Sequence, residues 1–467
     1  MNPAKINFSE FPWAESNVGV RSQAIVRNGK KLRLVEFTDK FVEHDWCIKG
    51  HFGYVLEGEL EISFSIGRKF GSAKTPSLMQ WPIKTRPCKK TILRDLMKDA
   101  TRVVRAGLPD VQQGEAFLPG PTFAGTYHLT GDPTSSVYAY GRYNNPTWTA
   151  YEKAIGELEG GTSTVVFSSG MAAVAATLGV ILKSGDIVVM PSDAYYAARM
   201  IADSFFTALG VVVRLAPTAD NAQREHLPGA KLLWLESPSN PGLDVCDIAL
   251  LVEAAHAVEA LVAVDNTTPS CLGQQPLALG ADFSLSSDTK VTTGHSDLIL
   301  GHVSVRDSSW AHELRAWRTQ MGSAPGPMEV WLAHRSLATL DVRLERQCKN
   351  ALAIAEFLAS RADVQRLRYP GLPSDPAYPI ASRQMKFYGP VISFELASRE
   401  LAESFLKHCG LVFEATSFGS VHTTAERRAR WGGDKVAEGF IRMSIGCEDL
   451  QDLIADLKQA LDHMHGK

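Results

Sequence analysis

The sequence predicts an α/β protein with a mostly parallel sheet, and three observations lead to that fold class. Short apolar runs of β type alternate with helical stretches between Thr164 and Val264, which is the pattern of strands joined by helical crossovers. Beyond Arg343 a long helical stretch leads to a new β-rich run at residues 391–394, which predicts a smaller C-terminal α/β domain. The chain of 467 residues is long enough for two or three domains with separate cores.

The composition excludes several classes of partner. A net charge of −3 and a charged share of 21% give no basis for binding nucleic acid or a membrane, so a small molecule is the expected partner. No apolar run approaches the roughly 18 residues of a membrane span, and the N-terminus resembles no leader peptide. The seven cysteines form no C-x-x-C pair, which favours reduced thiols and a cytoplasmic location.

The first 96 residues differ in character from the rest. Short alternating runs broken by glycine between Lys31 and Phe64 predict a small antiparallel β unit within residues 1–65. Residues 54–62 resemble the first half of a cupin, with Cys47 and His51 nearby, but no H-x-H is present, so no metal site is expected. Residues 66–96 are basic and aperiodic, which predicts an irregular linker.

Two stretches have the composition of phosphate sites. Tyr140 and Arg142 stand two residues apart on an extended segment before a helix that Pro146 opens, so a hydroxyl and a guanidinium lie on one side. A strand at residues 164–167 runs into Ser169, Gly170 and Met171 at the start of an Ala-rich helix, where free backbone N–H groups can bind an anion. The alternatives are an arginine on a loop and a plain strand-to-helix connection. Neither G-x-G-x-x-G nor a P-loop occurs.

Two further polar groups follow predicted strands. Tyr195 comes after the strand at residues 187–190, at the edge where open α/β sheets bind ligands. Asn240 lies between Pro238 and Pro241 after the strand at residues 232–235. The prolines restrict the backbone there, so the Asn240 amide can be held toward a ligand.

A lysine and a carboxylate form the centre of the candidate site. Lys290 stands at the polar exit of the apolar run at residues 281–285, where an amine must be paired, neutralised or used covalently. Asp265 ends the run at residues 261–264. This combination suits an aldehyde cofactor, with the amine attached to the aldehyde and the acid facing a ring nitrogen. Taken alone, Lys290 could equally be a surface lysine.

These motifs occur in one order, and from Met97 to the end the chain resembles the pyridoxal-phosphate (PLP) enzymes of cysteine and methionine metabolism. Ser286–Lys290 followed by Gly294–Asp297 corresponds to the family's S-x-T-K and G-H-S-D. The resemblance implies the fold type I of PLP-dependent transferases, with a large PLP-binding domain at residues 97–345 and a C-terminal α/β domain at residues 346–467.

The resemblance also implies residue roles. The catalytic residues would be Lys290, Tyr195 and Asp265. Substrate would be bound by Asn240, Ser417 and Arg442, with the Arg442 guanidinium on the α-carboxylate. Tyr140 and Arg142 would reach the phosphate of a neighbouring subunit, which implies a homo-oligomer, a dimer of dimers. The cofactor-binding set would be Tyr140, Arg142, Ser169, Gly170, Met171, Tyr195, Asn240, Asp265, Ser287, Thr289 and Lys290, with no metal.

The expected reaction is cystathionine γ-elimination, giving cysteine, 2-oxobutyrate and ammonia. The stretches at residues 417–423 and 425–432 are similar to those of cystathionine γ-lyases. Cystathionine β-lyase and γ-synthase are the alternatives within the family, and a non-catalytic binding or sensor protein is the alternative of another class. The chain departs from the family at Tyr196–Ala197, where two glycines are usual, and at His422, where a glutamate is usual.

Overall fold

The computed structural model describes residues 97–464 and, between residues 14 and 79, the backbone of short strands. The chain divides into two compact units, Met1–Met97 and Lys98–Lys467. In the first unit the strands are β1 (Ala14–Asn17), β2 (Val20–Arg27), β3 (Lys30–Phe37), β4 (Gly53–Val55), β5 (Glu59–Leu60), β6 (Ala73–Lys74) and β7 (Ser77–Met79).

Every strand pair in the first unit is antiparallel among the described residues: β1–β2, β2–β3, β4–β7 and β5–β6. The predicted antiparallel pairing is therefore present, but β6 and β7 lie inside residues 66–96, where an irregular linker is expected. Each pairs with a strand well upstream, a non-local contact that local periodicity does not reveal. Cys47 and His51, considered above as metal ligands, lie outside the described residues.

The second unit contains a seven-stranded sheet in the order β10-β9-β11-β12-β13-β14-β8. Pairs from β10 to β13 are parallel, whereas β14 is antiparallel to both of its neighbours. The mostly parallel sheet expected from the sequence is thus found, as one mixed sheet. The strands are β8 (Ser163–Phe167), β9 (Ile187–Pro191), β10 (Val212–Ala216), β11 (Leu232–Glu236), β12 (Leu261–Asp265), β13 (Phe283–Ser286) and β14 (Gly301–Val305).

Helices join and cover these strands. The predicted N-terminus at Pro146 is confirmed, because Asn145 caps α3 by accepting the N–H of Thr147. The helices of the second unit are α2 (Asp99–Val103), α3 (Pro146–Glu159), α4 (Gly170–Ile181), α5 (Tyr196–Ile201), α6 (Ile248–His256), α7 (Ser270–Gly273), α8 (Ser308–Met321), α9 (Pro327–Leu337), α10 (Leu340–Ala359), α11 (Tyr378–Gln384), α12 (Arg399–His408) and α13 (Leu450–His463).

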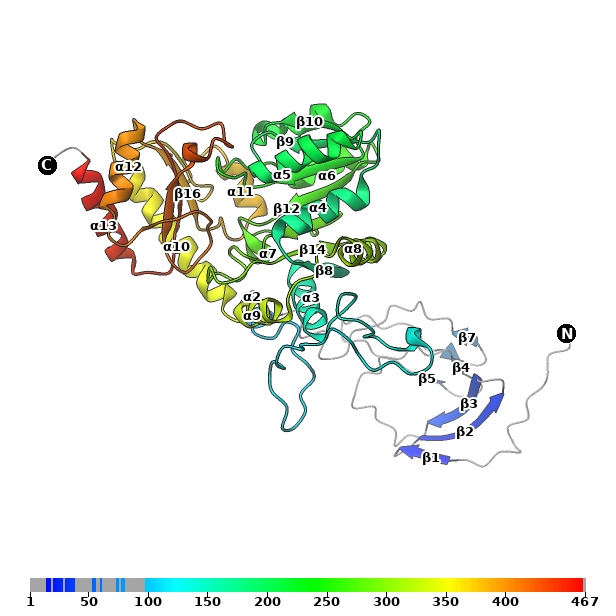
Figure 1. Ribbon diagram of the computed structural model, residues 1–467. Helices are drawn as coiled ribbons and strands as arrows, with labels where there is room; N and C mark the ends of the chain where they lie inside the picture. Colours follow the sequence, from blue (N-terminus) through cyan, green and yellow to red (C-terminus); the bar gives the residue numbers. More distant parts are fainter. Residues whose placement is uncertain are drawn as a thin grey trace. The chain divides into compact units, whose positions relative to one another are not determined.

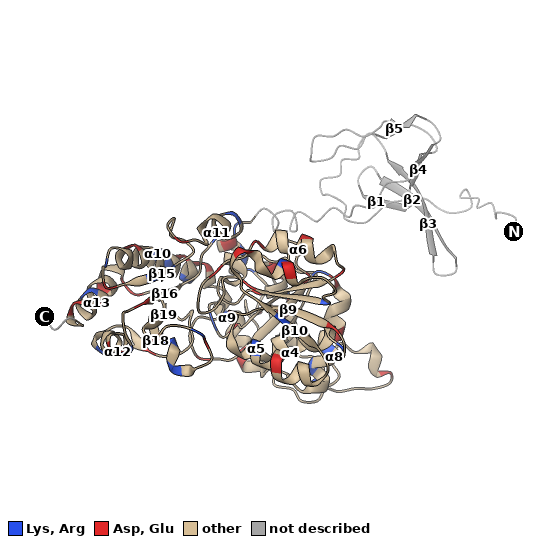
Figure 2. Ribbon diagram, turned by 90° about the horizontal axis from the view of Figure 1, so that it is seen from above, with Lys and Arg blue, Asp and Glu red and all other residues tan. Residues whose placement is uncertain are grey.

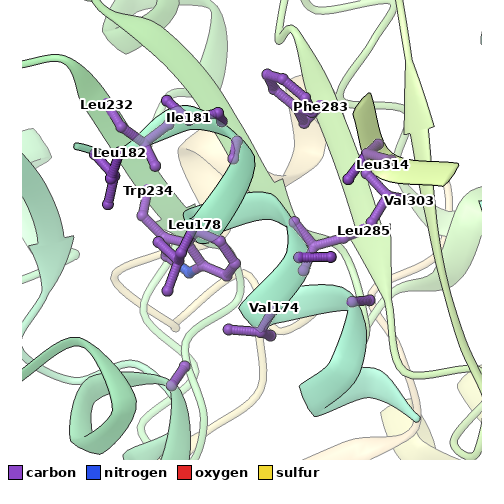
Figure 3. Packing of buried hydrophobic residues seen from close by; sticks show 14 of the residues in the cluster. Val174, Leu178, Ile181, Leu182, Leu232, Trp234, Phe283, Leu285, Val303 and Leu314 are labelled. Carbon is purple, nitrogen blue, oxygen red and sulfur yellow. The ribbon is translucent and has the colours of Figure 1, made fainter. Parts of the chain in front are cut away.

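The large sheet is buried on both faces because successive strand residues point to opposite sides. In β11, Leu232 and Trp234 pack with α4 and α8, whereas Leu233 and Leu235 pack with α6. Figure 3 shows the first of these clusters, in which Val174, Leu178 and other side chains of α4 face the sheet. Both faces are therefore closed, and polar chemistry is left to the strand ends.

The C-terminal lobe has a five-stranded sheet in the order β15-β16-β19-β18-β17. Its pairs are antiparallel except β17–β18. Residues of α10, α12 and α13 pack with this sheet in one buried cluster, and Figure 1 shows these helices gathered about β16. The strands are β15 (Gln365–Arg368), β16 (Val391–Glu395), β17 (Phe413–Glu414), β18 (Thr424–Arg427) and β19 (Phe440–Ser444).

Acidic and basic residues are both scattered over the elements of the second unit in the view of Figure 2. The pattern agrees with a net charge of −3 over the chain and with the expectation of a small-molecule partner. Among the described residues, no helix has the length and apolar character of a membrane span.

Candidate active site

The carboxyl ends of three neighbouring strands bring the predicted lysine and carboxylate to one edge of the large sheet. β11 ends at Glu236, and β12, the next strand in the sheet, ends at Asp265; these two residues are partners in the parallel register. β13 lies on the other side of β12 and leads into the turn that carries Lys290. Open α/β sheets bind ligands at this edge.

Lys290 is a partly buried amine that meets the C-terminal lobe. Its Nζ donates to the hydroxyl of Ser417 at 2.6 Å and lies 5.5 Å from the centre of the Phe418 ring. Burial, and to a smaller extent the positive charge of Arg442, lowers the pKa of the Lys290 amine from 10.5 to about 8. An amine with this pKa is in part unprotonated near neutral pH and can act as a nucleophile or a base.

Two buried carboxyl groups stand side by side at the strand ends. Asp265 Oδ1 accepts the Thr267 N–H at 3.0 Å and the Thr267 hydroxyl at 2.5 Å. Glu236 Oε2 accepts the Tyr195 N–H at 2.8 Å. Burial raises the pKa of both carboxyl groups, and the charge of Asp265 raises the pKa of Glu236 further. Glu236 is absent from the predicted site, although it begins the stretch that contains Asn240.

Arg442 contacts the other two predicted substrate-binding residues, Asn240 and Ser417. It lies on β19, and its Nη1 donates to Asn240 Oδ1 at 2.8 Å. Its Nη2 donates to the backbone oxygen of Ser417 at 3.0 Å and to Glu426 Oε1 at 2.5 Å. The Arg442 side chain is buried, so these acceptors offset the cost of taking a guanidinium out of water.

The loop at residues 417–419 joins Lys290 to Arg442 because one residue contacts both. The hydroxyl of Ser417 accepts from Lys290 and its carbonyl accepts from Arg442. The loop approaches Lys290 closely: a Cβ at Gly419, where φ is +86°, would lie 2.5 Å from the Val291 nitrogen. Ser417 itself has a φ of 79°, a conformation that costs free energy for a residue with a side chain.

The N-terminus of α4 meets the turn before Lys290. Ser169 caps the helix by accepting the Ala172 N–H at 3.0 Å, so Gly170 and Met171 hold the first two backbone donors of the helix. A Cβ at Gly170 would lie 2.6 Å from Ser287 Cβ, which shows how closely the two segments approach. Ser169, Gly170, Met171 and Ser287 are thus together, as predicted for a phosphate site.

Thr289, predicted to donate to the phosphate, contacts Leu300 with its hydroxyl in this structure. Its hydroxyl accepts the Leu300 N–H at 3.0 Å and donates to the Leu300 carbonyl at 3.3 Å. The side chain therefore ties the turn before Lys290 to the approach to β14. Leu300 reaches Thr289 because β14, which follows Leu300, pairs antiparallel with β13. The sequence did not indicate this pairing.

Tyr195 stands at the start of α5 on the same sheet edge. Burial and the neighbouring Tyr196 raise the pKa of the Tyr195 phenol, so the hydroxyl keeps its proton. The two rings meet edge to face with centroids 5.0 Å apart. Tyr196 lies against Gly433, since a Cβ there would be 3.1 Å from its ring. The residue that replaces a family glycine thus contacts the C-terminal lobe.

Tyr140 and Arg142 are not brought to Lys290 within one chain. Arg142 is exposed, donates to the Thr319 carbonyl at 3.0 Å, and lies 5.4 Å from the centre of the Tyr140 ring. His422, the other unusual residue, has its ring edge to face with Phe413 at 5.9 Å between centroids.

A buried ionic cluster next to the lysine turn was missed in the sequence. His302 Nδ1 lies 2.8 Å from Asp288 Oδ1, and His302 Nε2 lies 3.4 Å from Glu159 Oε1. Although burial opposes the charge, the two carboxylates raise the pKa of His302 from 6.5 to about 10. A single histidine in an apolar run gave no signal of this cluster.

The residues present fit PLP, which has an aldehyde, a ring nitrogen and a phosphate. Lys290 supplies an amine with a pKa of about 8, and Asp265 supplies a buried carboxyl on the adjacent strand end. The close approach of Gly170 to Ser287 puts a helix N-terminus beside a hydroxyl. Each part of the cofactor therefore has a group of suitable chemistry on one sheet edge.

Comparison with known proteins shows the family to which the chain belongs. Residues 100–462 match the family model of the Cys/Met metabolism PLP-dependent enzymes. A Streptomyces coelicolor protein named "Putative cystathionine gamma-lyase" is 56% identical over 368 residues, covering 78% of this chain and 93% of that protein. A cystathionine γ-synthase of Mycobacterium tuberculosis is 38% identical over 379 residues, covering 78% and 96%.

A solved structure shares the fold. The cystathionine γ-synthase of Xanthomonas oryzae pv. oryzae, in complex with cystathionine, has a TM-score of 0.75 and 33% identity, and the match covers 79% of this chain and 99% of that one. The lysine amine, the strand-end carboxyl and the extent of the match lead to one conclusion. The chain belongs to the Cys/Met metabolism PLP-dependent enzyme family, and its cofactor is PLP.

Proposed function

We propose that this enzyme is a cystathionine γ-lyase, which cleaves the Cγ–S bond of cystathionine to give cysteine, 2-oxobutyrate and ammonia. The 56% identity to the Streptomyces coelicolor protein carries the choice of the γ-lyase, and the double contact of Ser417 supports an amino-acid substrate. The Ser417 hydroxyl accepts from Lys290 and its carbonyl accepts from Arg442. An amino acid whose carboxylate is on the Arg442 guanidinium therefore has its Cα within reach of the amine.

When bound, PLP stores the electron pair released at the substrate carbons. The residues of the chain hold the cofactor, move protons and bind the substrate carboxylate. Lys290, with a pKa lowered by burial to about 8, holds the cofactor and afterwards moves the proton from Cα. Asp265 would pair with the ring nitrogen, and Tyr195 would stack on the ring while keeping a phenolic proton to donate. Arg442 and Asn240 hold the carboxylate.

The phosphate is assigned to the N-terminus of α4. Gly170 and Met171 would donate through the backbone, and the hydroxyls of Ser169, Ser287 and Thr289 would add side-chain donors. The Thr289 hydroxyl accepts the Leu300 N–H, so its own proton can turn from the Leu300 carbonyl to the phosphate.

Cystathionine γ-synthase is the second candidate, favoured by the 38% identity to the Mycobacterium tuberculosis enzyme of that name. A non-catalytic binding or sensor protein is disfavoured, because binding alone requires neither the Lys290 amine nor the Asp265 carboxyl. The higher identity to the Streptomyces coelicolor protein supports the lyase.

Product analysis separates these activities. Purified enzyme with PLP is incubated with cystathionine, and keto acids are identified by mass spectrometry. A γ-lyase gives 2-oxobutyrate and cysteine, whereas a β-lyase gives pyruvate and homocysteine. Condensation of an activated homoserine with cysteine in the absence of either cleavage would instead identify a γ-synthase and overturn the proposal.

We further propose a homotetramer, a dimer of dimers, in the cytoplasm. The segment that carries Tyr140 and Arg142 also exposes the large apolar side chains of Phe117, Phe123 and Val137. Exposed apolar side chains concentrated in one segment are typical of a contact surface. A second copy would cover them, and Arg142 would reach the phosphate in that copy's site. Light scattering of the eluted enzyme measures the mass; a monomeric enzyme with full activity would contradict this assembly.

The proposed domains are a β unit at residues 1–65, a linker at 66–96 whose strands β6 and β7 pair with β5 and β4 of that unit, a PLP-binding domain at 97–345 and a C-terminal domain at 346–467. The cupin resemblance of the β unit is proposed as structural only, without a metal. The lyase would then reside wholly in residues 97–467.

A further inference from the structure

The stretch Ala425–Gly432, similar in sequence to γ-lyases, has no role in the site described so far. Its first part lies on β18, next to β19 in the antiparallel sheet, and Glu426 is the register partner of Arg442. Its second part is the short 3-10 helix η5 (Arg428–Trp431). The stretch therefore begins beside the residue that we assign to the substrate carboxylate.

Glu426 is the buried centre of this stretch. Its Oε1 accepts from Arg442 at 2.5 Å and from Arg428 Nη1 at 2.7 Å. Its Oε2 accepts from the indole of Trp431 at 2.8 Å and from Arg430 at 3.3 Å. Burial alone would raise the pKa of this carboxyl, but the arginines and the indole outweigh burial and lower it. Glu426 is thus an ionised acceptor shared by several cations.

Arg428 is held on its other side by Asp434. Its Nε and Nη2 donate to Asp434 Oδ2 at 3.0 and 2.5 Å, and both side chains are 4% exposed. Asp434, Arg428, Glu426 and Arg442 therefore form a continuous row of alternating charges inside the protein. A fork onto one carboxylate leaves the guanidinium few orientations, so the position of Glu426 is fixed as well.

Asp434, at the end of this row of charges, lies next to Arg199 of the large domain. Arg199 of α5 donates to the Gly433 carbonyl at 3.1 Å and lies 3.8 Å from Asp434 Oδ1. Its Nε donates to the Ala194 carbonyl, directly before Tyr195. The segment at residues 428–434 is thus attached to α5, the helix that Tyr195 directly precedes.

We infer that Arg428 is a positioning residue for the substrate carboxylate, acting through Glu426 on Arg442. The inference rests on the proposed function in that the substrate is an amino acid. Two effects follow from the row of charges. The fork on Asp434 fixes Glu426 and hence the orientation of Arg442. The charge of Arg428 also balances Glu426, so that Arg442 keeps its attraction for a carboxylate instead of having it cancelled by the glutamate.

Two ligands that differ only in the carboxylate test this role. The PLP-loaded enzyme is titrated with L-alanine and with ethylamine, and the change of the visible cofactor band gives the dissociation constant. For R428Q we expect L-alanine to bind about ten- to a hundredfold more weakly, the loss of a charge-assisted contact. Ethylamine, which has no carboxylate, should bind as it does to the wild type.

The matched control is R427Q. Arg427 is also buried, but it pairs with Glu403 and Glu438, away from Glu426, so its loss should leave both ligands unchanged. R428K keeps the charge without the fork and should restore part of the L-alanine affinity. With cystathionine, R428Q should raise KM more than it lowers kcat.

The positioning role would be overturned if R428Q weakened the binding of both ligands equally, or if it left L-alanine binding unchanged. If R428Q does not fold, the same comparison of the two ligands in R428K decides, with equal weakening again counting against the role. The two proposals can fail separately. If R428Q weakens L-alanine binding but not ethylamine binding, and the wild type does not cleave cystathionine, the proposed reaction is refuted and the positioning role of Arg428 stands.

Discussion

His302 Nδ1 and Asp288 Oδ1 lie 2.8 Å apart, both fully buried, and Asp288 comes just two residues before Lys290 in the chain. The histidine sits on β14 and the aspartate in the lysine turn, so the pair fastens the turn to the sheet. Since burial opposes but two carboxylates favour the charge, the pKa of His302 rises from 6.5 to about 10.

The sign of the pH dependence follows from that rise. A folded-state pKa above the unfolded value means that the pair stabilises the protein fully below about pH 6.5 and that this stability is lost as the pH rises through about 10. We therefore expect His302→Gln to lower the free energy of unfolding most at mildly acid pH and least near pH 10. Denaturant unfolding across this range measures it.

The control for His302 is His256→Gln, which removes a more exposed contact to Asp282 at 2.9 Å and should change stability little. A loss in His302→Gln that does not depend on pH would contradict an ionised pair.

Asp265→Asn should reduce kcat by about a hundredfold to a thousandfold, the usual effect of removing one electrostatic contact to the reacting system. The amide preserves the shape and the contacts to Thr267 but cannot hold a proton on the ring nitrogen. Steady-state rates together with the visible band of the cofactor check this. Asp282→Asn, at the opposite end of the sheet, is the matched control; equal rates in the two variants would argue against the pairing.

Arg142→Ala should weaken PLP binding although Arg142 is exposed in the single chain and contacts Thr319. The reason is the proposed reach into a second copy. Mixing Arg142→Ala with Lys290→Ala should restore activity in hybrid oligomers, because one site then has both residues intact. No recovery after subunit exchange has been verified by mass would count against the shared site.

A chain that begins at Met97 should remain folded, bind PLP and cleave cystathionine at an unchanged rate. The first 97 residues form a separate compact unit, and the family match begins at residue 100. Activity assay and light scattering of the truncated enzyme decide this. Loss of PLP binding or of assembly would mean that the N-terminal unit is part of the enzyme.

The sequence was sufficient where chemistry depends on a strand end. Asp265 and Lys290 could be predicted because a polar group directly after an apolar run must lie at the carboxyl edge of a parallel sheet. The same logic placed Ser169 and Gly170 at a helix start. These features are local, so no knowledge of strand order was needed.

What was missed depends on non-local pairing. The contact of His302 with Asp288 exists because β14 inserts antiparallel beside β13. Glu426 contacts Arg442 because β18 and β19 pair in one register. Arg428 and Asp434 then meet across a turn. In the sequence such residues read as ordinary surface charges.

Borohydride trapping tests directly whether the Lys290 amine holds PLP. The enzyme is treated with borohydride, which makes the bond between cofactor and amine permanent, and the modified peptide is identified by mass spectrometry. We expect one modified residue, Lys290, in the wild type and none in Lys290→Ala. Modification of another lysine in the wild type, or a cofactor band and full turnover in Lys290→Ala, would contradict it.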